Sequence, residues 1–192
     1  MTSYDGKDKV SGVINQEVIE LATVGGELIA TSKVISSDKK GKSMGESFTT
    51  KIKCKEGNIS MNFQDIIGAA MPKMEGAEMK ITGDDLMYSY SLSVGQTFPD
   101  AKTNMEILLS GKSLMKMEFT MKNRKVAAKE NLTTPAGTFE CYKITYSMVS
   151  SMKMVGESTG ALWLSDGMMI KTESYSKKGE KTHTTLLTKL VK

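Results

Sequence analysis

Residue types that carry catalytic or metal chemistry are scarce in this chain. It contains one histidine, His183, and two cysteines, Cys54 and Cys141. Because no Cys-x-x-Cys or His-x-x-x-His spacing occurs, we expect no zinc site. A Cys141–His183 dyad stays open, since a nucleophile and its base are neighbours in space rather than in sequence. Neither a Gly-x-Ser-x-Gly turn nor a glycine-rich phosphate loop is present, so we expect no enzyme activity and no cofactor.

Methionine is the unusual residue type. It accounts for 16 of the 192 residues, well above its ordinary usage in globular domains. Thioethers suit copper(I), and three pairs have the spacing that such a site would use: Met115 with Met117, Met152 with Met154, and Met71 with Met74. Residues i and i+2 of a strand share a face, however, so a methionine-rich core strand produces the same pairs. Copper binding is therefore an alternative to plain core packing.

The composition is that of a single globular domain. Charged residues make up 25% and hydrophobic residues 39% of the chain, and the formal net charge of +4 comes from scattered lysines. This charge is too diffuse to predict a nucleic-acid partner. No run of 18 apolar residues occurs, so we expect no membrane span. The opening MTSYDGKDKV is polar and does not resemble a signal peptide. We expect residues 1–192 to form one domain, with residues 1–9 disordered.

Alternating apolar and polar residues predict that most of the chain forms β-strands. Two segments alternate most clearly, 114–122 and 137–148. Their apolar residues fall on one face each, and these two stripes are Met115, Met117, Phe119 and Met121 in the first segment and Tyr142, Ile144, Tyr146 and Met148 in the second. In 161–164, Trp163 shares a face with Ala161.

Turn signals separate the strand segments. Pro135 and Gly137 form a corner before the second stripe, and Asp166-Gly167 and Lys178-Gly179 mark further hairpins. Helix signals are few, and the best is FQDIIGAAM, residues 63–71. We therefore predict a mainly β fold. It would be a single large curved antiparallel sheet, a half barrel, with one or two short helices at its concave side.

Several motifs together resemble a bacterial envelope family of unknown function, the TapB-like group. They are AGTF, CYK, the single Trp163 in ALWLSDG and MIKTESYSKKGEK, in that order, preceded by LSVGQTFPDA and MKNRKVAAKE. The resemblance runs from about residue 12 to the C-terminus. It implies a fold similar to the lipoprotein carriers LolA and LolB, in which a sheet curls around an apolar concavity. It also implies a periplasmic or envelope-associated location, and it supplies no catalytic residue.

The location that the resemblance implies bears on the cysteines. In an oxidising periplasm, a disulfide between Cys54 and Cys141 would stabilise the fold by restricting the unfolded chain. Against this bridge, Cys141 shares a strand face with Lys143 rather than with the apolar Tyr142. Two free buried thiols are the other possibility, and the sequence leaves both open.

The apolar stripes and the carrier-like resemblance lead to a functional hypothesis. If the curled sheet lacks a complete second layer, the stripes line a groove for a lipid or acyl chain. The candidate ligand-binding residues are then Met115, Met117, Phe119, Met121, Tyr142, Ile144, Tyr146, Met148 and Trp163. The alternative is a structural or protein-interaction module of the cell envelope, in which the stripes are ordinary core and the partner is another envelope protein.

Overall fold

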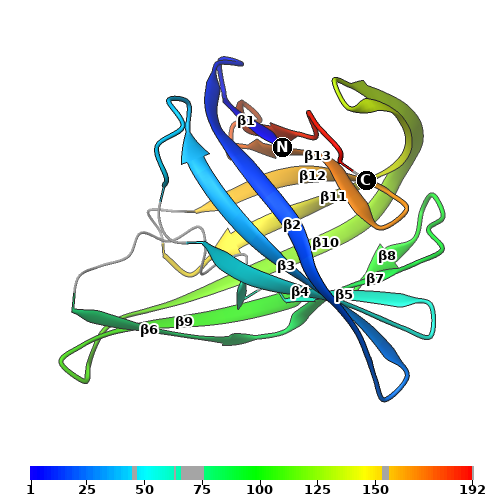
Figure 1. The fold of residues 1–192 in the computed structure, drawn as a ribbon. Coiled ribbons are helices and arrows are strands. Elements are labelled where there is room, and N and C mark those ends of the chain that lie inside the picture. Colours follow the sequence, from blue (N-terminus) through cyan, green and yellow to red (C-terminus); the bar gives the residue numbers. More distant parts are fainter. Residues whose placement is uncertain (45–46, 63, 66–75, 153–155, 192) are drawn as a thin grey trace.

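The structure is a computed structural model that describes residues 1–44, 47–62, 64–65, 76–152 and 156–191. Nearly all of these residues outside turns form antiparallel strands, as predicted (Figure 1). The strands are β1 (Thr2–Asp5), β2 (Val10–Val24), β3 (Glu27–Asp38), β4 (Phe48–Lys55), β5 (Asn58–Asn62), β6 (Ala77–Gly83), β7 (Asp85–Ser89), β8 (Thr97–Phe98), β9 (Ala101–Leu109), β10 (Lys112–Thr134), β11 (Gly137–Ser150), β12 (Glu157–Ser165), β13 (Met168–Tyr175) and β14 (Lys181–Leu186).

The expected helices lie mostly outside the described residues. Gln64 and Asp65 have helical backbone. Asn62 Oδ1 accepts hydrogen bonds from their backbone N–H groups at 2.9 and 3.2 Å, which is the arrangement of a helix N-cap. Residues 63 and 66–71 of the predicted helix are outside the described part of the chain.

The strands form one sheet that closes into a nearly complete barrel. Their order is β6-β9-β10-β11-β12-β13-β14-β1-β2-β3-β4-β5-β7, and β8 pairs separately with β10. The two end strands, β6 and β7, are consecutive in the chain and meet at Asp84. One continuous segment therefore pairs with β9 through its first half and with β5 through its second half. The predicted single curved sheet is confirmed, and it closes further than a half barrel.

The corner between β6 and β7 depends on a close approach of two backbones. A Cβ atom on Gly83 would collide with the carbonyl oxygen of Lys102 and the Cα of Thr103. Asp84 donates its N–H to the same Lys102 oxygen at 2.8 Å and accepts from the Lys102 N–H through Oδ2 at 2.9 Å. Glycine is thus required where the strand changes partners.

Strand β1, Thr2–Asp5, lies within residues 1–9, the segment that we expected to be disordered. β1 pairs with β14 on one side and with β2 on the other. The Met1 ammonium donates to the Ile14 carbonyl at 2.7 Å, and Ile14 N–H donates back to the Met1 carbonyl at 2.9 Å. This short polar strand is held by its two neighbours rather than by an apolar pattern of its own, so the sequence carried no signal for it.

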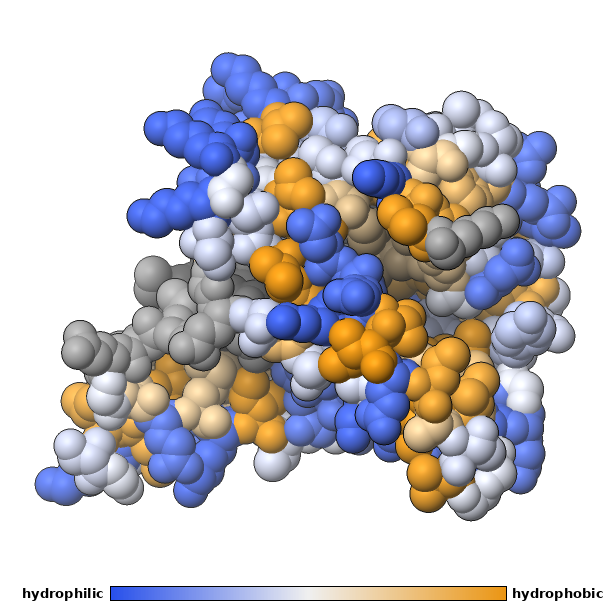
Figure 2. Space-filling view, in the orientation of Figure 1, coloured by the Kyte–Doolittle hydropathy of each residue, from blue (hydrophilic) through white to orange (hydrophobic). Residues whose placement is uncertain are grey.

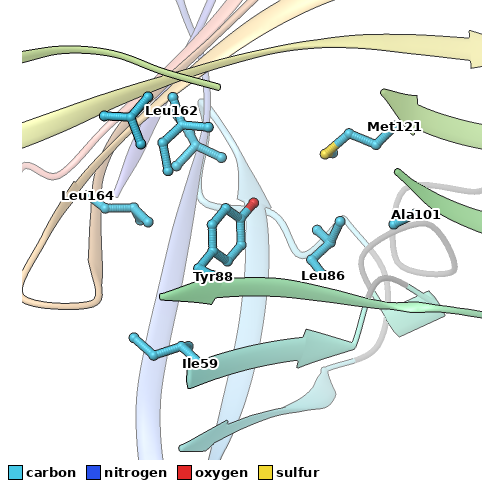
Figure 3. Close-up of a cluster of buried hydrophobic side chains, with 9 residues drawn as sticks. Ile59, Leu86, Tyr88, Ala101, Met121, Leu162 and Leu164 are labelled. Carbon is cyan, nitrogen blue, oxygen red and sulfur yellow. The ribbon is translucent and has the colours of Figure 1, made fainter. Parts of the chain in front are cut away.

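Buried apolar residues lie on both faces of the sheet. The inner cluster lies inside the barrel (Figure 3) and comprises Ile59, Leu86, Tyr88, Ala101, Met121, Val126, Ile144, Leu162 and Leu164. A second group, Met105, Ile107, Met117 and Phe119, continues along the same inner face, and Met148 packs against both groups. The outer cluster lies on the opposite face of β11, β12 and β13 and comprises Cys141, Ala161, Trp163, Ile170 and Leu187.

The Pro135 corner is the turn of the β10–β11 hairpin. Thr134 pairs with Gly137 across a two-residue connection. Thr134 Oγ1 accepts from the Ala136 N–H at 3.1 Å and lies 3.3 Å from the Gly137 carbonyl, to which it donates. The end of this hairpin curls over (Figure 1), and its residues Leu132, Ala136 and Phe139 pack against the outer cluster.

Candidate functional site

A small apolar pocket opens on the inner face of the barrel. Its volume is about 70 Å³. Strands β5, β7, β11 and β12 contribute to it, together with the loop after β7 and the β12–β13 turn. The lining residues of this inner pocket are Ile59, Met61, Tyr88, Ser89, Tyr90, Leu92, Tyr142, Leu164, Asp166 and Gly167.

Two rows of inward-facing side chains lead from the inner pocket across the sheet. Residues directly opposite one another in neighbouring antiparallel strands share a face, so the strand register defines each row. Both rows cross β2, β3, β4, β5 and β7 in turn. The first row is Leu21, Ala30, Ile52, Met61 and Leu86; the second is Thr23, Leu28, Cys54, Ile59 and Tyr88. We call them the hairpin rows, because they end on the β2–β3 hairpin.

The hairpin rows change from buried to exposed along their length. Leu86 and Tyr88 are each 2% exposed, whereas Leu28 is 46% and Leu21 is 67% exposed. The β2–β3 hairpin extends past the other strands (Figure 1), and hydrophobic surface gathers at its lower end (Figure 2). Figure 2 also shows a hollow beside β2 with apolar residues at its back. Part of the apolar inner face is therefore uncovered.

A buried arginine stands where β7 comes close to β8 and to the start of β9, a place that we call the barrel seam. Arg124 on β10 is 1% exposed. Its guanidinium donates to the Met87 carbonyl of β7 at 2.8 Å and to the Pro99 carbonyl, between β8 and β9, at 3.0 Å. The same group lies 4.5 Å from the ring centroid of Tyr88 and 5.3 Å from that of Phe98. Arg124 thus joins the two sides of the seam through hydrogen bonds and cation–π contacts.

The comparisons with known proteins place this barrel in a family. The model of the DUF3108-like family matches residues 1–187, nearly the whole chain. The chain belongs to the DUF3108-like family. No match was found among the curated proteins. The TapB-like and LolA-like names that the sequence motifs suggested are not confirmed.

Two solved structures share the fold of this DUF3108-like chain. One is a protein inferred to be exported, with a YmcC-like fold, from Bacteroides fragilis; it is 20% identical, the alignment covers 100% of this chain and 93% of that one, and the TM-score is 0.79. The other is a protein inferred to be a lipoprotein, from Parabacteroides distasonis; it is 19% identical over 99% of this chain and 92% of that one, with a TM-score of 0.78. At these identities the likeness establishes the fold alone.

Most of the residues that the sequence suggested for ligand binding lie on the inner face of the DUF3108-like barrel. Met117 and Phe119 belong to the inner face near β9, whereas Met115 on the same stripe is 39% exposed. The remaining residues of the two stripes pack in or against the inner cluster: Met121, Tyr142, Ile144, Tyr146 and Met148. Of these, Tyr142 lines the inner pocket.

Trp163 does not belong with these residues. It lies in the outer cluster, on the opposite face from Leu162 and Leu164. Its indole N–H donates to Glu130 Oε1 at 2.5 Å, and the ammonium groups of Lys143 and Lys171 lie 4.9 and 4.6 Å from its ring centroid. Including Trp163 in the inner site was wrong, because the β11–β12 register places it beside Lys143.

The cysteines and the histidine are not brought together. Cys54 packs against the inner cluster and Cys141 belongs to the outer one; both are free thiols, so the disulfide that we considered is not part of this structure. Burial raises the pKa of the Cys141 thiol, and its Sγ donates to the Phe139 carbonyl. His183 Nε2 instead lies 3.2 Å from Thr185 Oγ1. This environment does not favour a Cys141 thiolate.

The metal, membrane and surface-groove alternatives receive little support. The described residues contain no group of three or more His, Cys, Asp or Glu side chains arranged to hold a metal ion. Met71, Met74 and Met154 of the copper alternative lie outside them. Within the described ranges, no helix has the length and apolarity needed to cross a membrane. A larger groove, about 380 Å³, lies between turns lined by Asp5, Asp38 and lysines, where charged side chains are ordinarily solvated.

Tyr146 shows how tightly the inner face is packed. Its ring lies over the buried Gly160 of β12, the residue directly opposite it in the register. Burial raises the pKa of Tyr146 to about 12, and the nearby Tyr88 adds to this increase. The phenol is therefore kept neutral far above the pH at which a free tyrosine ionises, about 10.

This raised pKa predicts a loss of stability in alkali. Above pH 10 the unfolded tyrosine releases its proton while the folded one keeps it, so the free energy of unfolding falls as the pH rises from 10 to about 12. The contribution of Tyr146 is about 2 kcal/mol over this interval. It is measured by urea unfolding across this pH range together with the absorbance of tyrosinate.

The same pH-dependent unfolding is measured for the variant Tyr146→Phe, which serves as the control. Tyr175, whose pKa is also raised to about 12 by its hydrogen bond with Glu173, titrates in the same interval, so the difference between wild type and Tyr146→Phe isolates Tyr146. We expect the variant to lose less stability between pH 10 and 12. An identical decline in both proteins would contradict the prediction.

Sequence reasoning missed Arg124 and Tyr88. Arg124 stands in the polar run KNRK, and nothing local distinguishes it from a solvated lysine. Within β10, Asn123 immediately before it has a positive φ of 55°, and the β10–β11 register shifts between Lys122 and Lys125. A bulge of this kind redirects side chains, but its position could not be inferred from the sequence pattern.

Proposed function

We propose that this DUF3108-like protein is a cell-envelope protein that binds one hydrophobic chain, a lipid or an acyl chain. The hydrocarbon chain of this ligand would lie along the hairpin rows, with one end in the inner pocket. The observation that carries the proposal is the exposure of inward-facing leucines on β2 and β3, at the end of rows that begin in the barrel core. Exposed apolar surface continuous with an apolar pocket is typical of ligand and interaction sites.

The size of the inner pocket limits the form of the ligand. Pockets that enclose a whole small molecule have volumes of about 300–1,000 Å³, whereas this one has about 70 Å³. It would accept only the end of a ligand, and the remainder would cover the hairpin rows. A single flexible chain suits this shape better than a rigid, compact molecule.

The envelope location is supported by the two structural neighbours. One is inferred to be exported and the other to be a lipoprotein. Binding a hydrophobic chain is useful to a protein that works beside membranes, where such chains originate. Localisation is tested by fractionating cells that express the full-length natural protein.

The ligand hypothesis is tested first by native mass spectrometry of protein purified without detergent. We expect a discrete added mass, which solvent extraction releases as a lipid or fatty acid. Protein from which the bound lipid has been removed (stripped protein) should take up a fluorescent fatty acid. Protein that carries no added mass and takes up no fluorescent fatty acid would contradict the proposal. It would favour the alternative, in which the same exposed rows bind another envelope protein.

A matched pair of variants tests whether the hairpin rows form the binding surface. Leu21 and Val24 are 67% and 62% exposed near the same hairpin tip, but the register places Val24 opposite Glu27, on the other face from Leu21. We expect Leu21→Asn to weaken binding of the fluorescent fatty acid about tenfold, through lost apolar contact. Val24→Asn should leave binding within about twofold of wild type. Equal effects of the two substitutions would show that the rows are not the binding surface.

A further inference from the structure

Four buried side-chain polar atoms have no hydrogen-bond partner in the described structure, and two of them are donors on neighbouring residues inside the barrel. These two donors are the Tyr88 hydroxyl and the Arg124 Nε–H. Both residues are at least 98% buried, at 2% and 1% exposed. Buried polar groups are nearly always paired, so an unpaired one calls for an explanation such as a bound water or ligand.

The two residues lie against each other at the inner pocket. Tyr88 lines the pocket, whereas Arg124 is not among the lining residues; its guanidinium lies on the Tyr88 ring, 4.5 Å from the ring centroid. No carboxylate among the described residues forms an ion pair with Arg124; its two hydrogen bonds go to neutral backbone carbonyls. Among the residues that the structure describes, this buried positive charge therefore has no counter-ion, and burial makes such a charge costly unless an anion is present.

We propose that the ligand of the inner pocket is a single-chain carboxylic acid, whose carboxylate binds Tyr88 and Arg124 while its chain follows the hairpin rows. This inference rests on the proposed function and names the ligand class. A carboxylate has only acceptors and can receive several hydrogen bonds at once, and its bonds with a guanidinium are charge-assisted. It is also small enough for a pocket of about 70 Å³, whereas a phospholipid head group is much larger.

The test compares three ligands of equal chain length: palmitate, methyl palmitate and hexadecanol. Their binding to stripped protein is measured at neutral pH by displacement of an uncharged fluorescent lipid. We expect palmitate to bind at least about tenfold more tightly than its methyl ester, because only the acid supplies a charged acceptor. The alcohol, which has a hydroxyl but no charge, should resemble the ester.

The variants are Tyr88→Phe and Tyr175→Phe. Tyr175 lies on β13, is not among the residues that line the inner pocket and has its hydroxyl hydrogen-bonded to Glu173, so it is the control. Tyr88→Phe removes only a buried hydroxyl and should fold normally, which circular dichroism verifies. We expect this variant to lose most of the preference for palmitate over the ester, and Tyr175→Phe to retain it.

The outcomes separate this inference from the proposed function. Equal binding of palmitate and methyl palmitate would overturn the carboxylate site and leave hydrophobic binding standing. An undiminished preference in Tyr88→Phe would overturn the role of the tyrosine–arginine pair, and an ordered water would then be the partner of the two donors. Failure of all three ligands to bind would overturn both proposals.

Discussion

Replacing Arg124 with methionine is expected to lower the free energy of unfolding by about 3 kcal/mol. The substitution keeps an unbranched side chain but removes the guanidinium, and with it both hydrogen bonds across the barrel seam, to Met87 and Pro99. Each hydrogen bond to a charged group contributes about 1.5–3 kcal/mol, and the cation–π contacts with Tyr88 and Phe98 are lost as well. Part of this loss is offset because the variant no longer buries a charge.

The measurement is urea unfolding of wild type and variant, with Lys125→Met as the control. Lys125 is the next residue on β10 and its side chain is exposed, so this control should change stability by less than about 0.5 kcal/mol. If Arg124→Met were as stable as the control, the guanidinium would not hold the seam. The buried charge would then have no structural reason, and the case for a ligand would become stronger.

Adding one methyl group at Gly160 is expected to cost about 3 kcal/mol. The Cβ atom of Gly160→Ala would overlap the Tyr146 ring at Cζ, Oη and Cε2. Tyr146 is held in the inner cluster by its neighbours, so the ring cannot move aside without disturbing the core. Overpacking of this kind usually destabilises by about 1–3 kcal/mol, and we expect the upper end because the barrier is a rigid ring.

A double-mutant cycle with Tyr146→Leu checks this cause. Once the ring is absent, Gly160→Ala should cost less than about 1 kcal/mol, so the two substitutions should show strong coupling. The stabilities are measured by urea unfolding of all four proteins. Additive effects would mean that Gly160 is required for its backbone rather than for the space that it leaves to Tyr146.

Several features of the fold could be predicted because they are local. A strand has a side-chain period of two, so alternation in 137–148 correctly showed that Tyr142, Ile144 and Tyr146 share a face. Turn chemistry is also local: Asp166 and Gly167 both adopt positive φ, at 48° and 75°, in the hairpin that their residue types predict. Such patterns determined the mainly β class and the single antiparallel sheet.

The candidate site was predicted only in part, because faces must still be matched between strands. Alternation placed Trp163 and Ala161 on one face of β12, but it could not say whether that face meets Tyr142 or Cys141 of β11. The register decides this, and it pairs Trp163 with Lys143. The same limit applied to the cysteines, which lie on opposite faces of one sheet.

By itself, the sequence determined which residues share a strand face and where the chain turns. Only the tertiary structure decided how the barrel closes and what the closure buries. The chain between Ala77 and Ser89 changes partners at Gly83, and this brings Tyr88 under a guanidinium that comes from β10, more than thirty residues later in the chain. Such contacts depend on long-range pairing and on a bulge at Asn123, and the physical reason is that neither leaves a periodic signal in the residues that make them.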